Sequence, residues 1–234
     1  MTQIKHIAIK EFKDYFTSPI AYIVISIFLI ATGWFFFSTF FIYGRASMGD
    51  FFIILPTIFS FIIPAVTMRL LAEERNIGSY EILVTLPVSF TDIAVGKFLG
   101  ATLFITAMLI PTLLYPVSIS LLGDLDPGPV AGGYIGTILL GAAYCAIGLF
   151  ASALTRNQIV AFILGAAICF LLTILNRLLF FIPGAFASII DYIGANSHFI
   201  NISKGIIDSR DIIYFLSVIF LSIFGTYLVM KEKN

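Results

Sequence analysis

Residues 68–100 read MRLLAEERNIGSYEILVTLPVSFTDIAVGKFLG, a polar stretch between two long apolar segments. Gly78 permits a sharp change of chain direction, Ser79 can cap a helix that starts at Tyr80, and Pro87 ends that helix. The stretch therefore predicts a short helix along a membrane surface, held as a rigid bracket between two spanning helices. The alternative interpretation is a solvated connector with ordinary helix caps.

The predicted short helix carries an apolar face made of Ile82, Leu83 and Leu86. After it, Thr91 or Asp92 is expected to cap the next helix, because both side chains can accept a backbone N–H at a helix start. That helix then runs directly into the third apolar segment.

The composition places the chain in the membrane. Of 234 residues, 60% are hydrophobic and only 11% are charged, with a mean hydropathy of +1.07. Ordinary soluble domains are about 45–50% apolar and about 25% charged. The class is therefore a polytopic membrane protein, and the sequence contains no basic patch suited to nucleic acid.

Spanning helices need about 20 mainly apolar residues, and by that rule about six segments qualify. They are Pro19–Tyr43, Phe51–Leu71, Thr91–Leu122, Ala131–Leu154, Gln158–Ile182 and Asp211–Met230. Four prolines, at positions 56, 64, 111 and 116, are expected to kink the second and third spans. The predicted fold class is an all-α polytopic bundle, residues 1–234 forming a single transmembrane domain.

Two further segments are predicted at the membrane surfaces. Residues 1–17 place apolar side chains at helical spacing with lysines between them, which is typical of an amphipathic helix in the headgroup plane. Residues 183–210 are apolar in part but broken by proline and glycine, which indicates a re-entrant or interfacial segment on the outer side before the last helix.

The distribution of cations predicts the orientation. One side holds Lys5, Lys10, Lys13, Arg69, Arg75, Lys97, Arg156, Lys231 and Lys233. The other holds Arg45, Lys204 and Arg210, and its short loop 123–129 carries Asp124 and Asp126. Because cytoplasmic loops carry an excess of Lys and Arg, both termini and the loop 72–90 are predicted to be cytoplasmic.

Residues 73–87 have the pattern Glu-Glu-Arg-x-x-Gly-Ser-x-Glu-x-Leu-x-x-x-Pro, and Gly96-Lys97 follows it. This pattern resembles the first cytoplasmic loop of ABC-2 (type V) ABC transporter permeases. It is similar in particular to the gliding-motility permeases, often called GldF-like, which also begin with an amphipathic segment and Ser-Pro before the first span. This sequence differs from that family pattern in having Ser79 where Thr is commoner and Ile82 where Leu is commoner. The resemblance is specific over residues 10–20 and 63–100.

That resemblance implies a permease subunit of an ATP-driven exporter in the cytoplasmic (inner) membrane. Its partners would be a dimer of ATP-binding subunits, which would bind the ATP and Mg, a second permease chain, and membrane lipids. The second permease would be either identical or a companion with a large outer domain. The residues implied in coupling to the ATPase are Glu73, Glu74, Arg75, Gly78, Tyr80, Glu81, Leu83, Leu86 and Pro87.

The residues themselves point to no bond chemistry in this chain. A Gly-x-x-x-x-Gly-Lys-Ser/Thr phosphate loop is missing, because Gly96-Lys97 is followed by Phe98 and lacks the earlier glycine. No catalytic residue, cofactor, metal site or substrate contact is predicted. Cys145 and Cys169 lie in apolar runs and are expected to pack as small hydrophobes.

Several alternatives stay open at this point. His198 is expected to be structural, since no second His or Cys lies near it, and Arg177 is expected to reach the outer interface. A secondary transporter would place charged groups near mid-membrane, and a membrane-embedded hydrolase would pair His or Asp on facing spans. A mechanotransmitting or scaffold subunit of an ABC complex without transport remains a further alternative.

Overall fold

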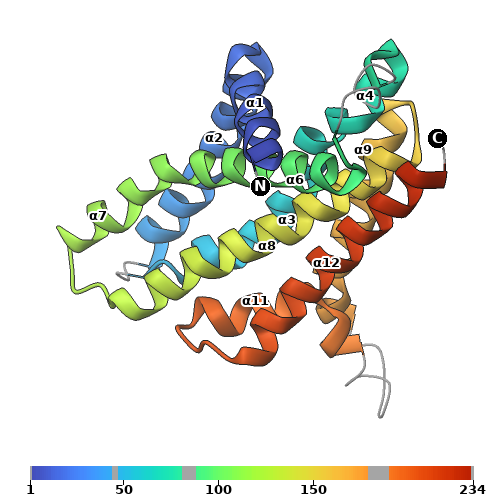
Figure 1. Cartoon of the computed structure of the whole chain (residues 1–234). Helices are drawn as coiled ribbons and strands as arrows, with labels where there is room; N and C mark the ends of the chain where they lie inside the picture. The colour runs from blue at the N-terminus through green and yellow to red at the C-terminus, as the bar shows by residue number, and fades with distance from the viewer. Residues whose placement is uncertain (1, 44–46, 81–87, 179–189, 233–234) are drawn as a thin grey trace.

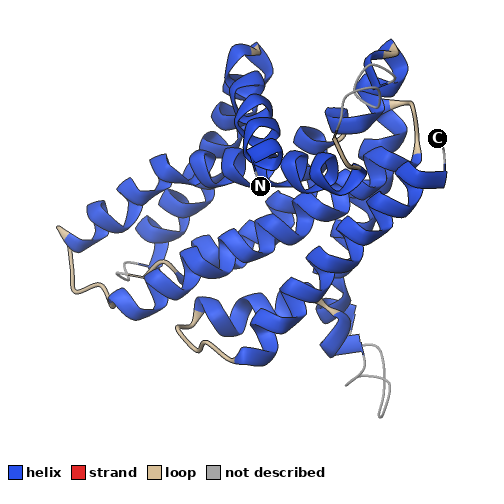
Figure 2. Ribbon diagram, viewed as in Figure 1, coloured by secondary structure: helices blue, strands red, loops and turns tan. Residues whose placement is uncertain are grey.

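The computed structural model describes residues 2–43, 47–80, 88–178 and 190–232, and these form helices joined by short turns, with no strand among them (Figures 1 and 2). The helices are α1 (Thr2–Thr17), α2 (Pro19–Tyr43), α3 (Gly49–Thr67), α4 (Arg69–Ile77), α6 (Phe90–Leu109), η1 (Ile110–Leu113), α7 (Leu114–Ser120), α8 (Pro127–Leu154), α9 (Gln158–Leu178), α11 (Ala195–Ser203) and α12 (Ser209–Glu232). The all-α class is confirmed.

Six helical segments of the described chain are long and apolar enough to cross a membrane, as predicted. The second runs on through α4 to Ile77, beyond the predicted end at Leu71. The third, Phe90–Ser120, changes at Ile110–Leu113 into a tighter 3-10 turn that contains Pro111. This change of helix type agrees with the expectation at Pro111, because proline cannot donate the helical hydrogen bond, whereas Pro56 and Pro64 lie within the continuous helix α3.

The start of the third span corrects one expectation. The cap is Ser89, not Thr91 or Asp92, and α6 begins at Phe90. Ser89 Oγ accepts the Asp92 N–H at 3.1 Å, and Asp92 Oδ2 accepts the Ser89 N–H at 3.4 Å. This reciprocal pair is a capping box, in which Ser89 is the N-cap and Asp92 is the third residue of the helix. The helix therefore starts earlier in the chain than expected.

Helix α8 runs diagonally through the middle of the molecule and packs against α3, α6, α9, α11 and α12 (Figure 1). Its glycines permit this close packing. A Cβ on Gly136 would come within 3.1 Å of the Ile202 side chain on α11, and one on Gly132 would overlap the Ile202 carbonyl oxygen. Small residues at this spacing therefore pack within the chain, as predicted.

Helix α1 is amphipathic, with Ala8 and Tyr15 buried and Lys5 and Lys10 exposed. Its inner face rests on the first half of α6, where Gly96 and Gly100 lie one turn apart. A Cβ on Gly96 would come within 2.7 Å of Ile7, and one on Gly100 within 2.7 Å of Glu11 Cβ. A Gly-x-x-x-Gly face on a spanning helix thus receives α1.

At the opposite end of the bundle, α11 packs against α8, α9 and α12. Phe199 and Ile202 of α11 are fully buried, so this part of the predicted segment 183–210 is an ordered, packed helix. Residues 183–189 of that segment lie outside the described residues. Both cysteines are fully buried, as predicted for small core residues.

Candidate functional site

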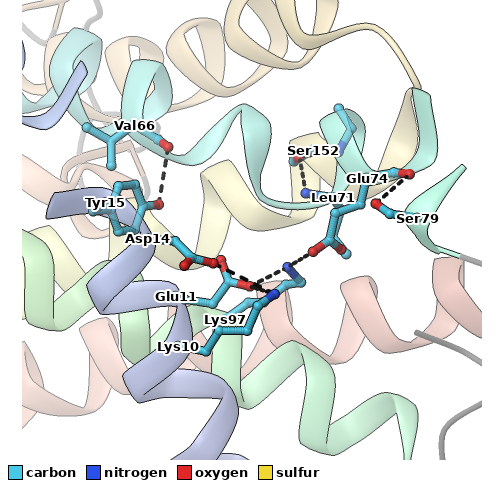
Figure 3. A network of polar contacts seen from close by, with 11 residues as sticks. Lys10, Glu11, Asp14, Tyr15, Val66, Leu71, Glu74, Ser79, Lys97 and Ser152 are labelled. Carbon is cyan, nitrogen blue, oxygen red and sulfur yellow. Dashed lines mark hydrogen bonds and ion pairs between the residues drawn. The ribbon is translucent and has the colours of Figure 1, made fainter. Parts of the chain in front are cut away.

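Lys97 forms a charged junction between three helices at the end of the molecule that carries α1 and α4. Its Nζ atom lies 2.7 Å from Glu11 Oε1 on α1 and 2.6 Å from Glu74 Oε1 on α4 (Figure 3). The Lys97 side chain is only 1% exposed, and those of Glu11 and Glu74 are 11% and 19% exposed. A buried ammonium needs such partners, because its desolvation costs several kcal/mol.

Local sequence places each member of this junction. Lys97 follows Gly96, whose missing side chain lets α1 approach, and Glu11 lies on the α1 face that turns toward α6. Glu74 lies on α4, which ends at Gly78 with φ of 84°, a left-handed conformation suited to glycine. The predicted change of direction at Gly78 is therefore confirmed.

Ser152 of α8 holds the bend between α3 and α4. Its Oγ accepts the backbone N–H groups of Leu71 at 3.0 Å and Ala72 at 2.9 Å, and its hydroxyl donates to the Met68 carbonyl at 2.7 Å. One buried hydroxyl thus satisfies three backbone groups that the helix break would leave without partners. The start of α4 is consequently attached to the central helix.

Arg75 attaches the end of α4 to the same central helix. Its Nη1 donates to the carbonyl oxygen of Ala153, and its guanidinium lies 4.7 Å from the centroid of the Tyr80 ring. Within the described part of the chain, Arg75 Nη2 and Glu74 Oε2 are buried without a hydrogen-bond partner. Buried polar groups of this kind require an explanation, since such groups normally find a partner.

Tyr15 makes a parallel connection from α1 to α3. Its hydroxyl donates to the Val66 carbonyl at 3.2 Å, and Arg69 lies 4.8 Å from its ring centroid (Figure 3). Burial raises the pKa of Tyr15 well above its usual range, so the hydroxyl keeps its proton and remains a donor at physiological pH.

An open polar cleft of about 310 Å³ separates α1 from α4. It is lined by Lys10, Glu11, Asp14, Arg69, Leu70, Glu73, Glu74, Ile77 and Ser79. Four of these residues are carboxylates and two are cations, so the lining carries an excess of negative charge. Ile77 in this lining is 70% exposed and gives the cleft an apolar edge.

The structure brings together five of the residues implied in coupling. Glu73, Glu74 and Arg75 lie on α4, Gly78 ends it, and Tyr80 is buried beside Arg75. The others, Glu81, Leu83, Leu86 and Pro87, lie outside the described residues, as does most of the predicted short helix. Ser79 is already helical, and its hydroxyl donates to the Glu74 carbonyl at 3.4 Å.

Sequence reasoning missed the central role of Lys97, which it used only as a cytoplasmic cation and as part of the Gly96-Lys97 motif. It also assigned no role to Glu11 or Ser152. One signal was present: Lys97 lies inside an apolar helix, and ionisable residues within such helices are usually paired and functional. Its partners could not be named, because they lie 86 and 23 positions away.

The far end of the bundle holds a second polar cluster. His198 Nδ1 lies 2.6 Å from Asp211 Oδ1, its Nε2 lies 2.9 Å from the Tyr192 carbonyl, and its ring stacks on Tyr214 at 4.1 Å. These contacts fit a structural histidine that joins α11 to α12. No group of three or more His, Cys, Asp or Glu among the described residues could hold a metal ion.

Comparison with known proteins places the chain in a family. Residues 6–202 match the family described as ABC-2 family transporter protein, and this match covers most of the chain. No curated protein sequence matches the chain. The chain therefore belongs to the ABC-2 family of transporter membrane proteins. It is a multi-pass membrane protein of the ABC transporter permease type, and this family implies an ATP-binding partner subunit.

Proposed function

We propose that the chain is the permease of an ATP-driven exporter in the cytoplasmic membrane, with α1, α4 and both termini on the cytoplasmic side. A separate dimer of ATP-binding subunits, carrying ATP and Mg, would dock on α1, α4 and residues 72–90, and a second permease chain would complete the path. The single observation that carries the proposal is the Lys97 junction, because it joins α4 to both α1 and the third span.

The junction supports a mechanical role for α4. A displacement of α4 would act on α6 through Lys97, on α8 through Ser152 and Arg75, and on α3 through the short turn at Met68. Packed interiors transmit such displacements because they resist compression. Coupling of this kind is reciprocal, so a substrate that biases the spans would also change ATP turnover.

The surface around α4 suits a protein partner with a basic side chain. The cleft between α1 and α4 carries excess negative charge, and Glu73 on its wall belongs to no ion pair among the described residues. Ile77 offers an exposed apolar anchor at the rim. An arginine or lysine of the ATP-binding subunit would satisfy the carboxylate while Ile77 entered an apolar groove.

The direct test is binding of the ATP-binding subunit by variants on this surface. Ile77→Asp should weaken association about 10–100-fold, since an isoleucine side chain contributes roughly 1.5–3 kcal/mol when it is buried. Glu73→Lys should weaken it as well, while Asp124→Lys at the opposite end should leave it unchanged. Normal association and normal substrate-stimulated ATP hydrolysis in both α4 variants would contradict the proposal.

Glu73 and Ile77 give a clearer test of partner binding than Glu74 does. Glu74 pairs with the buried Lys97, so a charge reversal there disrupts the fold as well as any partner contact. Glu73 and Ile77 lie at the surface of the cleft and avoid this ambiguity. The narrower resemblance to gliding-motility permeases stays a prediction, and co-purification of a companion permease with a large outer domain would support it.

A further inference from the structure

A mainly apolar cavity of about 510 Å³ lies at the end of the bundle opposite α1 and α4. It is partly open to the surroundings and lies between the start of α3, the start of α8 and the end of α11, and Phe52, Val130 and Ile200 contribute to its walls. Its volume falls within the range of about 300–1,000 Å³ that is typical of ligand pockets. It is separate from the Lys97 junction and plays no part in the coupling proposed above.

The walls of this cavity are held by tight backbone packing. Gly132 of α8 lies directly against the end of α11, where a Cβ would overlap the Ile202 carbonyl oxygen and come within 3.0 Å of Gly205 Cα. Gly205 itself has φ of 83°, which turns the chain back beside Gly128 at the start of α8. This contact fixes how the α8 and α11 walls of the cavity lie relative to each other.

Two opposite charges stand at the lining of the apolar cavity. Lys204 ends α11 and is exposed, and Asp126 precedes α8 and is exposed. Neither belongs to an ion pair among the described residues. Asp126 uses Oδ1 to accept the Gly128 N–H at 3.0 Å, which keeps its carboxylate oriented at the helix start.

The position of the cavity in the bundle indicates which layer of the membrane surrounds it. The first residues of two spanning segments, Gly49–Ile77 and Pro127–Leu154, contribute to its lining, so it lies where the chain passes from the headgroup layer into the acyl layer. The occupant must therefore have an apolar part in contact with Phe52 and Val130, and a polar part that carries both signs of charge near Lys204 and Asp126.

We propose that this cavity binds a zwitterionic glycerophospholipid with a primary ammonium group, of the phosphatidylethanolamine type. One acyl chain lies in the apolar cavity, and the phosphate pairs with Lys204 and accepts a hydrogen bond from the Ser47 hydroxyl. The ammonium donates to the free oxygen of Asp126. A trimethylated choline headgroup lacks N–H donors and cannot make that last contact.

The test compares three phospholipids with the same acyl chains. The chain, purified in mild detergent, is titrated with phosphatidylethanolamine, phosphatidylcholine or phosphatidylglycerol, and bound lipid is counted by native mass spectrometry. We expect one phosphatidylethanolamine per chain at about 10-fold lower concentration than the other two, as one additional charge-assisted contact contributes about a factor of ten.

Substitutions in the cavity lining test whether the lipid binds in this cavity. Asp126→Asn keeps the oxygen that caps α8 but removes the charge, so it should abolish the preference over phosphatidylcholine. Lys204→Gln should weaken all three lipids. Val130→Trp should fill the cavity and remove the bound lipid, with Ile135→Trp as the matched control on the same helix, since Ile135 is 46% exposed and lies outside the cavity lining.

Several outcomes of these measurements would contradict the proposed phosphatidylethanolamine site. Equal retention of the three lipids, or retention unchanged by Val130→Trp, would show only the lipid that coats any membrane protein. A preference for phosphatidylglycerol that persists in Asp126→Asn would show an anionic-lipid site and overturn the zwitterionic assignment. If Val130→Trp does not fold, Ile53→Trp replaces it, because Ile53 lines the same cavity and is already 54% exposed.

Discussion

The ammonium group of Lys97 lies 2.7 Å from Glu11 Oε1, although the two residues are 86 positions apart in the chain. Glu74 approaches the same nitrogen at 2.6 Å from a third helix. Lys10 Nζ also lies 4.0 Å from Glu11 Oε1, but its side chain is 59% exposed, so Lys97 is the buried cation between the two carboxylates. The junction is therefore sensitive to the loss of Lys97 in particular.

Lys97→Met should destabilise the protein by about 3–5 kcal/mol, because two buried carboxylates would then face each other without a cation. The triple variant that adds Glu11→Gln and Glu74→Gln should recover most of that loss, since it removes the charges together. Thermal unfolding in detergent measures both. Lys5→Met on α1 is the control, because Lys5 is exposed and belongs to no ion pair among the described residues, and surface charges of this kind contribute about 0–1 kcal/mol.

Ser152→Ala should destabilise the protein by about 1–3 kcal/mol, because the backbone groups of Leu71, Ala72 and Met68 would lose a buried partner. Hydrogen exchange should increase at the start of α4 before it increases elsewhere. Ser217→Ala removes an exposed hydroxyl that donates only within α12, to the Ile213 carbonyl at 2.7 Å, and should change little. Equal effects of the two substitutions would contradict this role of Ser152.

Gly96→Leu and Gly100→Leu should each displace α1 from α6. The added side chains meet Ile7 and Glu11 at the point of closest approach, and overpacking of this kind costs about 1–3 kcal/mol. Protease cleavage within residues 2–17 should become faster than in the native chain. Gly33→Ala on α2 is the milder comparison, since its nearest neighbour is the Tyr115 hydroxyl at 3.2 Å. Native protection of α1 in both leucine variants would refute the packing argument.

Single cysteines at Asn76 and Asp124 should react from opposite sides of the membrane in a background that lacks Cys145 and Cys169. Both positions are exposed; Asn76 lies on α4, and Asp124 lies in the turn between α7 and α8, at the opposite end of the bundle (Figure 1). Asn76 should react only with reagents that enter the cytoplasm, because the cation distribution predicts that side for α4. Reaction of both cysteines with an impermeant reagent in intact cells would contradict the predicted topology.

The sequence by itself determined the class and the spans. Long apolar runs and the proline at position 111 act locally, so hydropathy and helix chemistry predict the spans and the 3-10 turn without tertiary contacts. The turn at Gly78 was predictable for the same reason, because only glycine adopts its left-handed conformation without strain.

Only the tertiary structure decided which polar residues meet. The burial of Lys97 depends on Gly96 and Gly100, which bring α1 close enough for Glu11 to pair with it, and on the α4 bend that Ser152 holds. The cavity near Lys204 and Asp126 likewise exists because Gly132 draws α11 against α8. Charges and glycines of this kind look ordinary in sequence, since their energetic role depends on partners that only the packed helices bring within a few ångströms.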